Sequence, residues 1–248
     1  ERQLMKRTID AERLYADAVE NIYRGGITEA KNLLKKSLMK DPVHANAYLR
    51  LAELYLRDKK VEAAQDILKK GFSICPLNPE IIFKLIDVYI AANDRIQGYE
   101  LLNNYLKKEP KSLYALEKIR GLLIEDKQWH EAIEHQKKVI AIMKTGGFFE
   151  AVSDKLKAEI NILSGIRYET AKAFYKEEKW SSGMEQIEEI LKVDNSFIPA
   201  HILKGNIYYK QGKPSSAVKI WERAYRRYHH IALFMQLEEL YLKESLPY

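Results

Sequence analysis

One segment of the chain has the composition of a zinc-binding helix, and its spacing decides whether it can act as one. The residues from His130 to His135 read His-Glu-Ala-Ile-Glu-His. A zinc protease of this kind needs two histidines four residues apart, so that both rings lie on one helix face. Here the separation is five residues, and at about 100° per residue the rings point about 140° apart. The sequence therefore predicts two surface histidines on a helix and no shared metal ion.

The other histidine pair and the cysteine give no stronger sign of chemistry. His229 and His230 are adjacent, and neighbouring residues on a helix do not face each other. Cys75 is the single cysteine, which excludes a disulfide framework or a multi-cysteine zinc site within these residues. It is compatible with a reducing compartment, and no partner for nucleophilic chemistry lies near it in the sequence.

Two glycine pairs complete the search for catalytic motifs. Neither Gly25-Gly26 nor Gly146-Gly147 is followed by the Lys-Ser/Thr of a phosphate-binding loop, and both indicate turns. The chain is therefore predicted to be no enzyme, with no catalytic residue, no metal and no cofactor in this segment.

The charge balance and the tyrosines raise the question of nucleic-acid binding. The 248 residues carry 41 Lys and Arg against 35 Asp and Glu, a net charge of +6. A nucleic-acid-binding surface concentrates its cations on one face, whereas Lys and Glu alternate here along predicted helices. Four of the 16 tyrosines occupy core positions of the repeat described below: Tyr48, Tyr55, Tyr89 and Tyr208. We therefore predict no nucleic-acid partner.

A 34-residue repeat predicts the elements that hold these residues. In the clearest copy, which begins at Ala45, apolar, small and proline residues occupy positions 4, 7, 8, 11, 20, 24 and 32. They are Tyr48, Leu51, Ala52, Tyr55, Ala64, Leu68 and Pro76. The spacing recurs one unit earlier and in the next two units, and it resembles the tetratricopeptide repeat. That resemblance implies an all-α protein, a right-handed superhelical solenoid of about six helix-turn-helix units, in which each unit pairs a helix A with a helix B.

The register of the repeat breaks once. Units one to four fall within residues 1–146, and units five and six within 164–231. The intervening 147–163 segment keeps helical apolar spacing at Phe149, Val152, Leu156, Ile160 and Leu163. It is predicted to lengthen helix A of unit five by about 25 Å, after a break at the glycine pair. Residues 232–248 are predicted to form a capping helix with a polar outer face.

The resemblance to tetratricopeptide repeats implies a partner-binding groove lined by A helices. Arg50, Lys84 and Lys118 all occupy position 6 of consecutive units and form what we call the cationic ladder. We expect the ladder to bind an acidic peptide or helix of another protein. The alternative is pairing within each helix, of Arg50 with Glu53 and of Lys84 with Asp87.

A second candidate surface follows from the same positions in units five and six. We call it the aromatic–basic patch; its members are Tyr168, Lys172, Tyr175, Lys176, Asn206, Tyr209 and Lys210. Aromatic and cationic anchors of this kind are typical of protein recognition. A carboxylate clamp for chaperone tails is not predicted, because unit one has Tyr15 and Val19 where that clamp needs Lys and Asn.

Several stretches resemble a narrower family. Trp129, Ala132, Ile133 and Gln136 match the W-x-x-A-hydrophobic-x-x-Q stretch of the bacterial lipopolysaccharide assembly protein B (LapB, also YciM) family. Three segments are similar to the end of that family: 197–205, 217–221 and 237–242. The resemblance implies a cytoplasmic adaptor, anchored at the bacterial inner membrane, that brings a zinc deacetylase of lipopolysaccharide synthesis to a membrane protease.

The family's membrane helix and four-cysteine zinc ribbon have no counterpart in these residues. No run of 18 apolar residues occurs, and the chain begins at Glu1, so we interpret it as a segment of a longer protein. The alternative function is a general tetratricopeptide scaffold, or a co-chaperone-like assembly factor, for an unknown partner. A homodimer is also left open.

Overall fold

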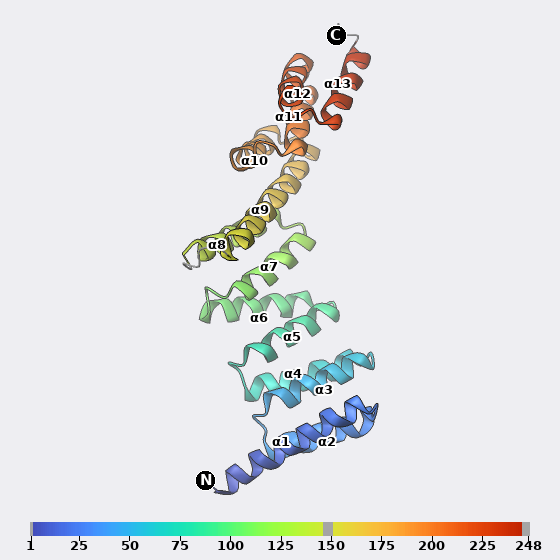
Figure 1. Cartoon of the computed structure of the whole chain (residues 1–248), viewed down its shortest axis with the longest axis vertical. Coiled ribbons are helices and arrows are strands. Elements are labelled where there is room, and N and C mark those ends of the chain that lie inside the picture. The colour runs from blue at the N-terminus through green and yellow to red at the C-terminus, as the bar shows by residue number, and fades with distance from the viewer. Residues whose placement is uncertain (1, 146–150, 245–248) are drawn as a thin grey trace. The chain divides into compact units, whose positions relative to one another are not determined.

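The computed structural model describes residues 2–145 and 151–244, and within them it contains thirteen α-helices and no strand (Figure 1). The all-α prediction is therefore confirmed. The chain divides into two compact units, Glu1–Pro110 and Lys111–Tyr248.

The first unit consists of three helix pairs. Its helices are α1 (Arg2–Tyr23), α2 (Ile27–Lys40), α3 (Ala45–Arg57), α4 (Val61–Ile74), α5 (Pro79–Ala91) and α6 (Arg95–Lys108). Within the pairs, α1 packs on α2, α3 on α4 and α5 on α6, while α2–α3, α4–α5 and α3–α5 contacts join successive pairs. Small residues allow the close approach, since Ala18, Ala52 and Ala64 are completely buried.

The second unit contains three more pairs and a final helix. Its helices are α7 (Leu113–Glu125), α8 (Trp129–Thr145), α9 (Ala151–Lys176), α10 (Trp180–Val193), α11 (Ile198–Lys210), α12 (Pro214–Tyr228) and α13 (Ile231–Glu244). The pairs are α7–α8, α9–α10 and α11–α12, and α13 packs on α12 and α11. The expected polar outer face of the last helix is wrong in part. Apolar side chains are exposed along α13: Ile231, Phe234, Met235 and Leu242.

The turn between the two helices of a pair has one geometry throughout the described residues. In each of these turns, the residue at position 15 of the repeat has a positive φ, in the left-handed region. These residues are Gly25, Lys59, Asn93, Lys127, Glu178 and Gly212. The next N–H donates to a carbonyl five residues back, as from Lys60 to Tyr55 at 2.9 Å. This is the Schellman arrangement that ends a helix, and it reverses the chain in every unit.

Buried polar groups form hydrogen bonds between the long helix α9 and its neighbours α7 and α8. Its residues 151–163 are helical, whereas the expected break at Gly146-Gly147 lies outside the described residues. Arg120 of α7 donates at 2.5 Å to Gln136 Oε1 of α8 and at 2.5 Å to Glu159 Oε2 of α9. The Gln136 amide donates to the Glu159 carboxylate at 2.7 Å and to its backbone carbonyl at 2.6 Å.

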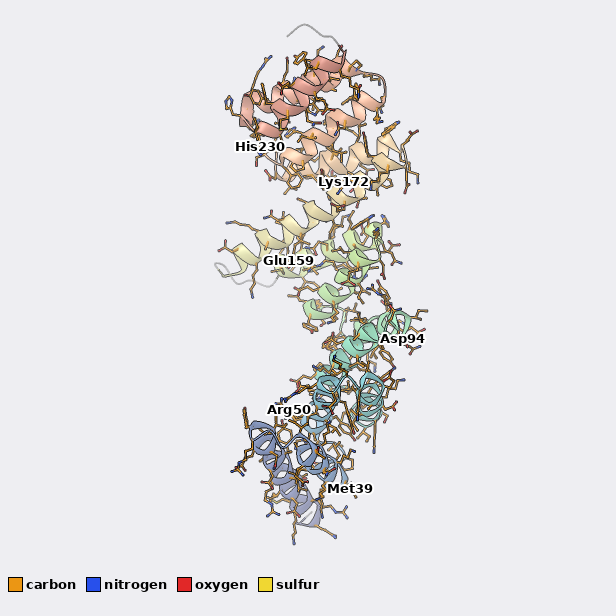
Figure 2. All side chains as sticks on the ribbon, turned by 90° about the vertical axis from the view of Figure 1, so that its right-hand side faces the viewer. Met39, Arg50, Asp94, Glu159, Lys172 and His230 are labelled. Atoms are coloured by element: carbon orange, nitrogen blue, oxygen red, sulfur yellow. The ribbon has the colours of Figure 1, made fainter. Side chains whose placement is uncertain are left out.

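Nothing in the repeat pattern predicted this cluster. Arg120 occupies position 8, where the repeat favours a small residue, and its side chain is 13% exposed against 14% for Glu159. Figure 2 marks Glu159 on the long helix. The carboxylate of the long helix satisfies the guanidinium and the amide together. The cluster therefore specifies where α9 lies on α7 and α8, because any other position would leave these buried groups unpaired.

Candidate partner-binding surfaces

Two members of the cationic ladder lie in the first unit and share one carboxylate. Arg50 of α3, marked in Figure 2, donates from Nη1 to Glu53 Oε2 at 2.8 Å. Lys84 Nζ of α5 lies 3.8 Å from Glu53 Oε1. Partial burial lowers the pKa of Arg50, but hydrogen bonds to Tyr15 and Glu53 outweigh it and raise that pKa overall. Of the two pairings expected within a helix, that of Arg50 with Glu53 is confirmed, and Lys84 approaches Glu53 of the neighbouring helix α3. Glu53 thus offsets one of the two positive charges that an acidic partner would meet here.

The third member of the ladder belongs to the second unit. Lys118 lies on α7, and its Nζ atom is 6.0 Å from the ring centroid of Tyr114, the range of a cation–π contact. Arg50 and Lys84 therefore belong to one compact unit and Lys118 to the other. A continuous ladder of three cations remains a prediction.

The aromatic–basic patch lies entirely in the second unit, on two helices that contact each other, α9 and α11. Lys172, marked in Figure 2, donates to both carboxylate oxygens of Glu169, at 2.8 and 2.9 Å. Its ammonium lies 5.4 Å from the Tyr168 ring centroid. The hydrogen bond to Glu169 raises the pKa of Lys172. Lys176 and Lys210 are exposed and form no ion pair within the described residues.

The tyrosines of the patch also pack against the apolar core. Tyr168 meets Phe197 edge to face at 5.7 Å, Tyr175 meets Trp180 at 5.6 Å, and burial raises the pKa of both tyrosines. Both pack against the apolar cluster that joins α9, α10 and α11. Both side chains are half-buried, so part of each remains accessible to a partner.

On α11, Tyr209 packs against the cluster formed by α12 and α13, and the Lys243 ammonium lies 5.4 Å from its ring centroid. Asn206 is half-buried beside it in the same helix. The patch can therefore offer fixed aromatic side chains, one amide and two exposed ammonium groups, which suits the side chains of an acidic polypeptide.

The histidine segment differs from expectation at one residue. His130 is exposed as predicted, but His135 is half-buried, and burial followed by the charge of Lys138 lowers its pKa. The side of α8 that carries His135 packs inward, which the spacing argument did not consider. Among residues 2–145 and 151–244, no group of three or more His, Cys, Asp or Glu side chains is arranged to hold a metal ion.

Comparisons with known proteins show which fold and which repeat the chain resembles. Residues 23–74 match the family described as Tetratricopeptide repeat. The chain is similar to a BBSome complex member BBS4 homolog of Drosophila melanogaster, at 32% identity over 73 residues. The aligned part is 28% of this chain and only 15% of that protein.

Two solved structures share the arrangement of helices. One is a tetratricopeptide repeat protein from Parabacteroides merdae, with 16% identity and a TM-score of 0.50 over 93% of this chain and 98% of that one. The other is the structure of Naa15/Naa10 bound to HypK-THB, with 16% identity and a TM-score of 0.58 over 96% and 34%. At such identities the likeness concerns the fold alone.

Among the described residues, no helix is both long and apolar enough to cross a membrane. The family match and the helix pairs agree with the spacing of the turns, which is 34 residues except across the insertion between Lys127 and Glu178. Residues 23–74 carry a tetratricopeptide repeat, and the described chain folds as a tetratricopeptide α-solenoid.

Proposed function

We propose that the chain is a non-catalytic adaptor that binds other proteins through the inner faces of its A helices. The observation that carries the proposal is the aromatic–basic patch on α9 and α11. There, core packing holds the half-buried tyrosines in place, and Lys176 and Lys210 are exposed on the same two helices. Anchors that are already immobilised lose little side-chain entropy when a partner binds.

The expected partner segment is acidic. Glu169 already neutralises Lys172, so the net positive charge of the patch comes from Lys176 and Lys210. In the first unit, Arg50 and Lys84 together exceed Glu53 by one charge. Both surfaces therefore favour carboxylates, with the patch as the primary site and the ladder as a secondary one.

The resemblance to the LapB family supports a more specific role. On that basis we propose that the partners are a zinc deacetylase of lipopolysaccharide synthesis and a membrane protease that degrades it. The chain would then work in the cytoplasm, at the inner face of a bacterial inner membrane. The general alternative is a tetratricopeptide scaffold for another assembly.

The test is calorimetric titration of the chain with each of the two purified proteins. Exposed contacts are each worth about 0–1 kcal/mol, so we expect Lys176→Glu/Lys210→Glu to weaken binding by about tenfold through charge reversal at both. The ladder variant Arg50→Glu/Lys84→Glu/Lys118→Glu is expected to have a smaller effect. Lys36→Glu/Lys40→Glu on α2 changes two exposed lysines outside both surfaces and serves as the control.

Unchanged binding by the Lys176/Lys210 variant would contradict the patch as the site. Absence of binding to both purified proteins would contradict the LapB-like role and leave the general scaffold. Light scattering of the same samples decides whether the chain forms a homodimer.

A further inference from the structure

A basic cavity lies between α10, α11 and α12 in the second unit. Its volume is about 600 Å³, and none of its lining residues belongs to the aromatic–basic patch or to the cationic ladder. Three successive helices contribute to it, so its walls come from residues far apart in the sequence.

Four cations line this cavity against a single carboxylate. Lys192 of α10, Lys204 of α11, and Arg223 and Arg227 of α12 face it together with Glu188. Lys204 donates to Glu188 at 2.7 Å, and this hydrogen bond lowers the pKa of the Glu188 carboxyl. Lys192 likewise pairs with Glu189 at 2.6 Å, so the positive charge that no described carboxylate offsets in this cavity is that of Arg223 and Arg227.

The two arginines are the groups most available to a ligand. Arg223 and Arg227 are exposed, lie four residues apart on one face of α12, and pair with no carboxylate in the described part of the chain. They also line a second cavity of about 430 Å³ together with Lys219, Glu222 and Arg226, and there Arg226 pairs with Glu222 at 3.2 Å. The Arg227 guanidinium lies 5.6 Å from the Tyr228 ring centroid, a contact that leaves its hydrogen-bond donors without a carboxylate partner.

A structural explanation accounts for only part of this arrangement. Cations in the last turn of a helix are stabilised by its dipole, which explains Arg226 and Arg227 at the end of α12. The dipole acts within the last turn, however, and Arg223 lies before it. Lys192 and Lys204, on two other helices, are each accounted for by an ion pair, with Glu189 and Glu188 respectively, so Arg223 is the cation that these explanations leave over.

The wall of the cavity that carries Asn195 is held by hydrogen bonds. The Tyr228 hydroxyl donates to Asn195 Oδ1 at 2.8 Å, and His201 Nε2 lies 2.7 Å from the Asn195 carbonyl oxygen. A carbonyl only accepts, so His201 Nε2 carries the hydrogen in this contact. With its side-chain oxygen engaged, Asn195 retains an amide N–H₂ as a further donor beside the arginines.

We propose that this cavity binds a phosphate monoester, carried on a soluble metabolite or on a lipid head group. A phosphate has three oxygens and up to two negative charges, and guanidinium groups bind it through paired hydrogen bonds. A lone carboxylate has one charge and two oxygens, fewer than the donors that converge here. A bound phosphate would offset the excess positive charge that the protein itself leaves unpaired.

The test offers the same phosphate monoester in two forms, dissolved in water and carried on a lipid in vesicles. The full chain is titrated with glycerol 3-phosphate at about 0.15 M salt and, separately, sedimented with phosphatidic acid vesicles, with phosphatidylcholine vesicles as the blank. We expect binding to at least one phosphate form. Arg223→Gln/Arg227→Gln should weaken that binding by about tenfold or more, because both guanidinium groups are lost.

The matched control is Lys36→Gln/Lys40→Gln. It removes two exposed cations that also lie four residues apart at the end of a helix, in the first unit. Its binding should stay within about twofold of the parent. Thermal melts establish that both variants are folded.

Binding of glycerol 3-phosphate in solution identifies a metabolite site, and binding of the vesicles alone identifies a lipid head group; each supports the proposal. Absence of binding to both forms overturns it. An equal loss of binding in the Arg223/Arg227 and Lys36/Lys40 variants also overturns it, because binding would then follow the net charge of the protein and not the cavity. Tighter binding of a glutamate-rich peptide than of glycerol 3-phosphate overturns it as well, and assigns the cavity to an acidic polypeptide.

Discussion

At the scale of single residues, His135 couples stability to pH. Burial lowers its pKa below the ordinary value of 6.5, so the folded protein holds this ring neutral where the unfolded chain would protonate it. Its Nδ1 atom is buried and has no hydrogen-bond partner in the described residues. Protonation therefore favours the unfolded state, and the stabilisation present above pH 6.5 is lost as the pH falls below that value.

We expect His135→Leu to reduce the loss of unfolding free energy between about pH 7.5 and pH 5.5, measured by urea denaturation. His130→Leu, at an exposed position of the same helix, should leave the pH dependence unchanged. An equal effect of the two substitutions would show that burial of His135 is not the cause.

Replacing either of two helical glycines in the second unit by alanine should change the stability of the fold, and in opposite directions. A Cβ at Gly205 would overlap the indole of Trp221, which is itself held by a 3.2 Å hydrogen bond to the Ile202 carbonyl. A Cβ at Gly165 on α9 meets nothing within 4 Å.

Gly205→Ala is therefore expected to destabilise the fold by about 1–3 kcal/mol or more through overpacking. Gly165→Ala should stabilise it by about 0.5–1 kcal/mol, because alanine loses less backbone entropy in a helix. Calorimetric melting of both variants gives the comparison. A stable Gly205→Ala variant would mean that Trp221 can move away.

At the scale of elements, the recurring turn contains avoidable strain. Lys59 has φ 60° in its Schellman turn, where Gly25 holds the equivalent place one unit earlier with φ 82°. A side chain in this region costs about 1–2 kcal/mol, partly offset by the greater entropy that glycine loses on folding.

We expect Lys59→Gly to raise the free energy of unfolding by about 0.5–1 kcal/mol, measured by chemical denaturation. The reverse change, Gly25→Ala, should lower it by a similar amount, although no atom lies within 4 Å of the added methyl group. Lys59→Ala separates the loss of charge from the change of backbone and should give no such gain.

The polar cluster of Arg120, Gln136 and Glu159 should behave as one cooperative group. Arg120→Met leaves a carboxylate buried without its cation, at a cost of about 3–5 kcal/mol. The double variant Arg120→Met/Glu159→Met removes both charges and should recover a large part of that loss.

Urea denaturation of the single and double variants measures the coupling. Lys137→Met, which breaks the half-exposed pair with Glu134 on α8, should cost less than about 1 kcal/mol and serves as the control. If the losses of unfolding free energy caused by substituting Arg120 and Glu159 were additive, the two residues would not be coupled. The cluster would then not be what positions α9.

At the scale of the whole molecule, the 34-residue period allowed the helices to be predicted with their order. Each helix pair repeats one set of local contacts, so Ala52 in one unit indicates the role of Ala18 in another. The candidate surfaces were predictable only as positions on helices. That Glu53 lies between Arg50 and Lys84, and that Tyr168 and Tyr175 pack into the core, depends on neighbouring helices.

The sequence by itself determined the helices and their pairing, because helical periodicity and turns act over a few residues and recur in each unit. Only the tertiary structure decided which polar groups meet. Glu159 reaches Arg120 across 39 residues, and the basic cavity brings Lys192 of α10 to Arg227 of α12. Such contacts follow from how side chains of successive helices converge, and a repeat that describes mainly apolar positions contains no information about them.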